Sequence, residues 1–283
     1  MITTLTTEQA IELVPAIGAT APSDIVSDKY QFVSTQDILN RVQQQGWRIT
    51  NATGQGSRAT SQHRVTLVHE TYLNENLLNQ QEGLPRIEMF NSHDRTKRLM
   101  FAIGYFRFVC SNGLIIASGP AESIRAKHRF SDNKLENIMD QVSCISERFP
   151  EINKKITSFK ERTLTEDEQQ SFAEYAIRGR FLYRPSMPKR YEKMQEATNA
   201  LLTSRRTEDE GNSAWQVYNR VQENLIRGIE GFSRGIRGYG DSVRVNQLLW
   251  KGTEVTLENT GNRLSQVYKE LLNKDGQKGK ISN

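Results

Sequence analysis

The chain has 283 residues, of which 38 are Lys or Arg and 33 are Asp or Glu, so it carries a net charge of +5. Its mean hydropathy of -0.64 is that of a polar protein, but three Trp, nine Tyr and eleven Phe exclude disorder along the whole chain. No stretch reaches the roughly 18 apolar residues that span a bilayer, and the N-terminus has no secretory signal. Two distant cysteines, Cys110 and Cys144, favour a reducing compartment, so we expect a cytoplasmic protein with no membrane partner.

The N-terminal half has the pattern of an antiparallel sheet that follows one helix. A helix is indicated where apolar residues recur at helical spacing and Gly46 follows them. A segment rich in Gly, Ser and Thr, residues 51–62, predicts a loop or mobile flap. The helix is expected at residues 35–45 and the strands at 47–50, 63–70, 86–90, 97–110 and 114–117.

The last two strands form the strongest short-range signal in the chain. Asn112-Gly113 between two apolar runs is typical of a β-hairpin turn. Both faces of the first run are apolar, which indicates a central strand that is covered on both sides. One of these faces also carries aromatic residues beside a cation, namely Phe101, Tyr105 and Arg107. Single strands of nucleic acid are held by such a combination, but core packing with one paired arginine is the interpretation we favour.

After Phe130 the apolar spacing becomes helical and stays so. Pro150 is expected to end or kink the first helix, and Ser213 to cap the fourth. The helices are predicted at residues 135–145, 165–177, 189–206, 213–227 and 243–251, with a last one through Leu272.

This order of elements indicates an α+β protein, with an N-terminal antiparallel sheet, flanking helices and a C-terminal helical part packed against it. The expected divisions are a sheet-rich α+β core at 24–130, a helical region at 131–273 and a disordered tail at 274–283.

Cations are clustered rather than spread evenly. Residues 86–130 hold eight Lys or Arg against three carboxylates, and residues 178–206 hold eight against two. A third segment, 227–240, sets Arg227, Arg234 and Arg237 among five glycines. Glycine allows the backbone to approach a phosphate closely and arginine neutralises it, although a flexible, solvated loop has the same composition. Clustered cations favour a polyanionic partner.

Recognisable catalytic motifs are missing from the sequence. It contains no GxxxxGK[ST], HExxH, GxSxG or CxxC. His63 and His69 share a strand face and could meet His93 or Cys110 in a metal site, but strand or core histidines explain this spacing as well. We therefore expect no enzyme activity, no catalytic residues, no metal and no cofactor.

Several phrases of the sequence resemble the phage/plasmid-like family called domain of unknown function 932. The most specific is FNSHDRTKRLMFAIGYFRFVCSNGL, residues 90–114, and WQVYNRVQENLIRG follows at 215–228. Weaker matches are SDKYQFVSTQDIL at 27–39, KHRF at 127–130 and VNQLLW at 245–250. The resemblance implies a protein of mobile elements in a DNA-metabolism context, and no catalytic residue is carried over. Arg220 and Val221 depart from the commoner family form, which has a small residue and Thr there.

Charge and resemblance together predict a phage-encoded nucleic-acid-binding protein of the host cytoplasm. Single-stranded DNA is the expected ligand, annealing in phage replication or recombination the expected role, and a homo-oligomer the expected state. The alternative is a non-catalytic protein that binds a host factor in counter-defence. The expected binding residues are Arg86, Lys97, Arg98, Arg107, Arg125, Lys127, Arg129, Arg234 and Arg237, with Phe101 and Tyr105 as stacking candidates.

Overall fold

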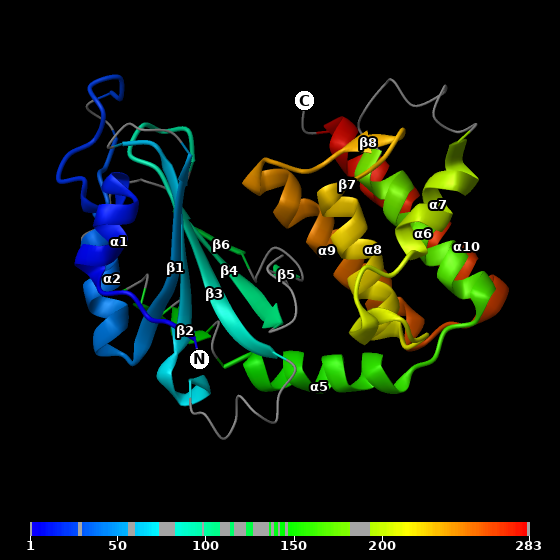
Figure 1. Cartoon of the computed structure of the whole chain (residues 1–283). Helices are drawn as coiled ribbons and strands as arrows, with labels where there is room; N and C mark the ends of the chain where they lie inside the picture. The colour runs from blue at the N-terminus through cyan, green and yellow to red at the C-terminus, as the bar shows by residue number, and fades with distance from the viewer. Residues whose placement is uncertain are drawn as a thin grey trace. The chain divides into compact units, whose positions relative to one another are not determined.

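The structure is a computed structural model of the whole chain (Figure 1). It describes residues 2–27, 30–55, 60–73, 83–97, 99–107, 114–115, 123–126, 136, 139–140, 142–144, 147–181 and 193–281. Within these ranges the side chains of residues 55, 106–107, 114–115, 123–126, 239 and 275–281 are not described.

The chain folds as two compact units, Met1–Phe149 and Pro150–Asn283, called unit 1 and unit 2 below. Unit 1 contains the sheet and unit 2 is helical, so the predicted α+β class and the order of its parts are confirmed. The boundary between the units falls later in the chain than the expected one at residue 130.

Unit 1 is an antiparallel sheet in the order β1-β2-β3-β4-β5, with β6 also paired to β4. Short helices precede or interrupt the strands, and α1 and α2 lie beside β1 (Figure 1). The helices are α1 Thr7–Leu13, η1 Pro15–Gly18, α2 Thr35–Gln44 and η2 Glu70–Tyr72. The strands are β1 Trp47–Gln55, β2 Gln62–His69, β3 Gly83–Asn91, β4 Leu99–Arg107, β5 Leu114–Ile115 and β6 Ser123–Ala126.

The core of unit 1 consists of cross-strand rows that face α2. Val65 pairs with Met89 and Met89 with Phe101, and all three are buried. Alternate residues of a strand point to one face, so Tyr105 lies on the same face as Phe101. Both aromatic rings are buried, and β3 is buried along its whole length. The expectation of a central, covered sheet region is thus met in the described part of the hairpin.

A polar cluster lies inside unit 1 where β2 and β3 meet the start of α2. His63 Nδ1 lies 2.9 Å from the carbonyl oxygen of Ser61, so this nitrogen carries the hydrogen and donates it. His63 Nε2, 2.8 Å from Thr35 Oγ1, is then left as an acceptor. Asn91 donates to the same hydroxyl at 3.0 Å, and the His93 ring lies 5.2 Å from that of His63. Burial therefore holds His63 as a neutral, single tautomer.

Unit 2 is built around one central helix. The helices are α5 Phe149–Glu161, α6 Glu166–Phe181, α7 Met194–Leu202, η4 Thr207–Asp209, α8 Ala214–Arg227, α9 Tyr239–Thr256 and α10 Gly261–Ile281. Between α8 and α9 runs a small hairpin, β7 Gly228–Ile229 and β8 Ser233–Arg234. Helices α6, α7 and α9 all contact α8. As predicted, Ser213 caps α8, and it forms a capping box with Gln216.

The polar residues of α8 are buried and hold the neighbouring loops. Arg220 is only 6% exposed and donates to the carbonyls of Asp209 and Gly211 and to Gln169 Oε1, each at 2.9 Å. Asn224 donates to two further carbonyls, of Leu201 and Thr203. Buried polar groups are stable where such bonds are made. Arg220 therefore belongs to the buried side of this helix.

Three local predictions differ from the structure. Residues 51–55, expected in a loop, extend β1, because their backbone pairs with β2 beyond a register shift between Ile49 and Asn51. Pro150 does not end a helix but lies in the first turn of α5, where a missing amide hydrogen is tolerated. Residues 274–281 continue α10 as a helix, since a helix that is already nucleated propagates through Lys and Gln at little cost.

No helix in the described part of the chain is both long enough and apolar enough to cross a membrane.

The pKa of His63 generates a prediction for stability. Burial lowers this pKa below its ordinary 6.5, although the hydrogen bond to Ser61 and the charge of Asp94 oppose the shift. The unfolded chain then binds more protons than the folded one as the pH falls below 6.5, so the free energy of unfolding decreases there. We expect a decrease of up to about 1.4 kcal/mol for each unit by which the pKa is lowered.

Urea titrations at pH 7.5 and 5.5 test this on the wild type and on His63→Asn, which cannot titrate at this position. His69→Asn is the matched control, because His69 is half-buried and lies at the other end of β2. A pH dependence that is unchanged in His63→Asn but reduced in His69→Asn would contradict the assignment.

Candidate anion-binding pocket

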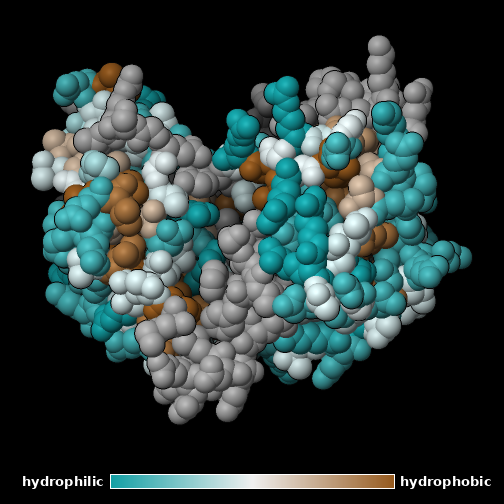
Figure 2. Space-filling view, in the orientation of Figure 1, coloured by the Kyte–Doolittle hydropathy of each residue, from teal (hydrophilic) through white to brown (hydrophobic). Residues whose placement is uncertain are grey.

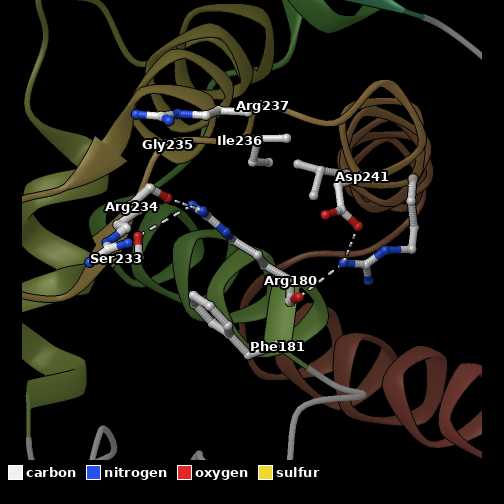
Figure 3. A pocket seen from close by; sticks show the side chains of 10 residues that line it. Arg180, Phe181, Ser233, Arg234, Gly235, Ile236, Arg237 and Asp241 are labelled. Carbon is white, nitrogen blue, oxygen red and sulfur yellow. Dashed lines mark hydrogen bonds and ion pairs between the residues drawn. The ribbon is translucent and has the colours of Figure 1, made fainter. Parts of the chain in front are cut away.

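A pocket of about 350 Å³ lies in unit 2 between the end of α6, the β7–β8 hairpin and the start of α9 (Figure 3). This is within the roughly 300–1,000 Å³ of small-ligand sites. Four arginines face one carboxylate, a formal charge of +3 for the lining. The lining residues are Arg180, Phe181, Ser233, Arg234, Gly235, Ile236, Arg237, Asp241, Arg244 and Val245.

Arg180 positions the hairpin wall of this pocket. It lies near the end of α6, is 9% exposed, and donates to the backbone carbonyls of Leu225 and Arg234. Its Nη1 also lies 3.3 Å from the hydroxyl of Ser233. The guanidinium thus joins three elements, α6, the end of α8 and β8. The dashed lines in Figure 3 show its bonds to Ser233 and Arg234 of β8. The planar fork of arginine suits this, because its donors point in several fixed directions.

Glycine makes the turn into this hairpin. Gly228 ends α8 with a φ of 98°, a backbone conformation that residues with a side chain rarely adopt. A Cβ at Gly228 would also lie 2.6 Å from the backbone nitrogen of Gly235, and one at Gly235 would lie 2.6 Å from the carbonyl oxygen of Arg227. The two backbone segments can approach each other only because both positions lack a side chain. The glycines of this segment therefore specify a close-packed hairpin rather than a flexible loop.

Arg244 forms the opposite wall. Its guanidinium donates to the carbonyls of Gly179 and Arg180 at 3.2 and 3.0 Å, in the last turn of α6. A cation there interacts favourably with the unpaired carbonyls at the end of a helix. Asp241 Oδ1 lies 4.0 Å from the same guanidinium and brings the one negative charge of the lining.

Two of the arginines are accessible. The side chains of Arg234 and Arg237 are exposed, whereas Arg180 is almost fully buried. Within the described part of the chain the Arg234 side chain has no ion-pair partner. The face of unit 2 seen in Figure 2 is mainly hydrophilic, with smaller hydrophobic patches. An anion that enters the pocket can therefore be bound by these two side chains.

The residues expected in unit 1 are distributed differently. Lys97 is half-exposed, but Arg86 is 6% exposed and its Nε lies 2.6 Å from Glu88 Oε1. Phe101 and Tyr105 are 0% and 5% exposed, so they offer no ring face on which a base could stack and belong to the core. The side chains of Arg107 and Arg125 lie outside the described residues, as do Arg98, Lys127 and Arg129 entirely. Of the expected binding residues, the structure brings only Arg234 and Arg237 together in a described pocket.

The histidines do not form the considered metal site. His63 and His93 are in contact, as that interpretation required, but His69 packs against Trp47 with ring centroids 5.3 Å apart. Cys110 lies outside the described residues. Among the residues that the structure describes, no group of three or more His, Cys, Asp or Glu could hold a metal ion.

Sequence reasoning missed Arg180 and Arg244 as parts of the site. Arg180 was visible only as one member of a cationic cluster, and Arg244 as a residue of a predicted helix. Their role depends on the packing of α6 against α9, which no local pattern reveals.

The chain matches a known protein family and is similar to proteins of Escherichia coli. Residues 22–251 match the model of a family described as Domain of unknown function (DUF932), as the resemblance in the sequence predicts. UPF0380 protein YafZ of Escherichia coli (strain K12) is 27% identical over 268 residues, which cover 89% of this chain and 92% of the relative. UPF0380 protein YfjQ of the same strain is 26% identical with the same coverage. No solved structure matches the chain.

The bonds of Arg180 predict that Arg180→Ala destabilises unit 2 and loosens the hairpin. The carbonyls of Leu225 and Arg234 lose a donor, the first in a buried and the second in a partly buried position. A buried loss costs about 1–3 kcal/mol and a partly buried one less, so we expect a decrease of about 2–4 kcal/mol in the free energy of unfolding. Trypsin should also cleave faster after Arg234 and Arg237. Arg178→Ala is the matched control, because Arg178 lies on the same helix in an exposed pair with Glu174 and should cost less than about 1 kcal/mol. Wild-type stability and cleavage in Arg180→Ala would refute the role of Arg180.

Proposed function

Because the chain belongs to the family described as a domain of unknown function (DUF932), we propose its function from the chemistry of its pocket: it binds the phosphates of single-stranded DNA in unit 2. The observation that carries this proposal is the lining, in which four arginines meet a glycine-shaped hairpin. Arginine binds phosphate through two parallel hydrogen bonds, which makes it the preferred side chain for such sites.

The two exposed arginines supply the contacts. Arg234 is the last residue of β8 and Arg237 lies in the segment that connects β8 to α9, while Arg180 and Arg244 add positive potential from the wall. The low exposure of Arg180 matters here, since the field of a charge is screened less when water is excluded. A phosphate in the pocket would therefore be held by direct bonds at Arg234 and Arg237 and by the field of the other two.

A single strand suits this pocket better than a duplex. A flexible backbone can bend so that one phosphate enters a concave site, whereas the phosphates of a duplex are fixed on a stiff, regular surface. No aromatic ring is offered for stacking by the described lining, so we expect little preference for base sequence. We place this binding in the cytoplasm of a phage host, in strand annealing during replication or recombination by a homo-oligomer; this setting stays a prediction.

The proposal predicts that Arg234→Ala combined with Arg237→Ala weakens binding to a labelled single-stranded oligonucleotide by roughly tenfold or more. A hydrogen bond to a charged group contributes about 1.5–3 kcal/mol, and about 1.4 kcal/mol corresponds to a factor of ten in affinity. Fluorescence polarisation at fixed low salt measures the dissociation constant. Arg263→Ala is the matched control, since Arg263 is an exposed arginine of α10 that does not line the pocket.

The carboxylate of the lining allows a test in the opposite direction. Asp241→Asn removes the negative charge but keeps the shape of the side chain, so we expect tighter binding. An absence of binding by the wild type at low salt would overturn the proposal. Equal losses in the pocket variant and in Arg263→Ala would also overturn it, because binding would then follow total charge.

A further inference from the structure

We infer that the pocket of unit 2 holds the terminal phosphate of a DNA strand, a phosphomonoester, in preference to a phosphodiester within the strand. This inference rests on the proposed function and specifies which phosphate the pocket takes. A terminal phosphate carries about 1.5 to 2 negative charges at neutral pH and has three free oxygens, whereas each internal phosphodiester carries one charge.

The first reason is the amount of positive charge in one small space. In the described lining, four guanidinium groups and one carboxylate surround a pocket of about 350 Å³. A single phosphodiester with one charge would leave most of this positive potential unbalanced. A dianionic end group matches this net charge better, and it offers three acceptor oxygens to Arg234 and Arg237.

The second reason is the start of α9, which adds a further anion-binding element. Helix α9 has 18 residues and begins at Tyr239, next to the lining residues Arg237 and Asp241. Its N-cap residue is Gly238, and no side chain caps the first turn by a hydrogen bond. The first amide hydrogens of a helix have no partner within the helix, and its positive dipole end favours negative charge. The preference for a dianion over a monoanion is therefore strengthened at this end of the pocket.

The third reason is that the described lining recognises phosphate but provides no surface for a base. Phe181 is 3% exposed. The Arg180 guanidinium lies 5.2 Å from its ring centroid, and the ring centroid of Phe232 lies 5.8 Å from it. The remaining apolar residues of the lining are aliphatic, Ile236 and Val245. A nucleotide within a strand would bring its base along, whereas an end group can enter by its phosphate alone.

The test compares three oligonucleotides of one sequence: with a 5′-phosphate, with a 3′-phosphate, and with hydroxyl groups at both ends. We expect at least one phosphorylated strand to bind about tenfold more tightly than the hydroxyl-ended strand, because about one additional charge-assisted hydrogen bond is gained. This preference should disappear when Arg234 and Arg237 are both replaced by Ala, and it should remain in Arg263→Ala.

The outcomes separate the inference from the proposed function. Equal binding of the three strands that is weakened in the double variant would leave the proposed function intact and overturn the inference. A preference that survives in the double variant would overturn it too, since the end would then be recognised elsewhere. No binding of any strand would overturn both. If a 5′-mononucleotide binds as tightly as the phosphorylated strand, the ligand of the pocket is a free nucleotide, and the assignment to a strand end is overturned.

The titration of the phosphate provides an internal control. Its second pKa is about 6, so a terminal phosphate loses part of its charge between pH 7.5 and 5.5, while arginine stays charged. Among the described lining residues, the charged groups that face it are the four arginines and Asp241. The preference for the phosphorylated strand should shrink at pH 5.5, and the hydroxyl-ended strand reports any change in the protein itself. A preference independent of pH would contradict recognition of the dianion.

Discussion

The pocket depends on one buried cation, the guanidinium of Arg180. A buried charge is costly unless oxygen atoms of the protein replace the water that it loses. Here two backbone carbonyls and the Ser233 hydroxyl do so. Because these oxygens belong to the end of α8 and to β8, the same bonds that stabilise the cation fix the hairpin on α6. The hairpin in turn presents Arg234 and Arg237. Structure and binding chemistry are thus linked through a residue that is itself almost inaccessible.

The two units use polar side chains in different ways. In unit 1 the cluster of His63, His93 and Asn91 around Thr35 is closed, and its members are bonded to one another or to nearby backbone. In unit 2 the polar residues of α8 also bond inward to loop carbonyls, but the chain then leaves this helix through Gly228 into a segment with exposed arginines. The polar cluster of unit 1 therefore stabilises the fold, whereas the polar side chains of α8 in unit 2 hold the loops beside the segment with the exposed arginines.

Local patterns located many of the elements but did not locate the site. Period-two alternation located β2, and Ser213 was recognisable as the N-cap of α8. The burial of Phe101 and Tyr105 depends on which face of the sheet the helices cover, and alternation cannot decide this. Arg234 and Arg237 were found because glycine and arginine alternate in one segment, whereas Arg180 and Arg244 come from helices that meet them only in the fold.

The salt dependence of binding is the most direct measurement of phosphate contacts in the pocket. Each phosphate that a protein neutralises on a single strand contributes about 0.7 to the slope of log affinity against log salt concentration. If Arg234 and Arg237 each neutralise one phosphate charge, their joint replacement by Ala should make the slope shallower by about 1.4, and Arg263→Ala should leave it unchanged. A wild-type slope in the double variant would contradict the assignment of the pocket as the DNA-binding site.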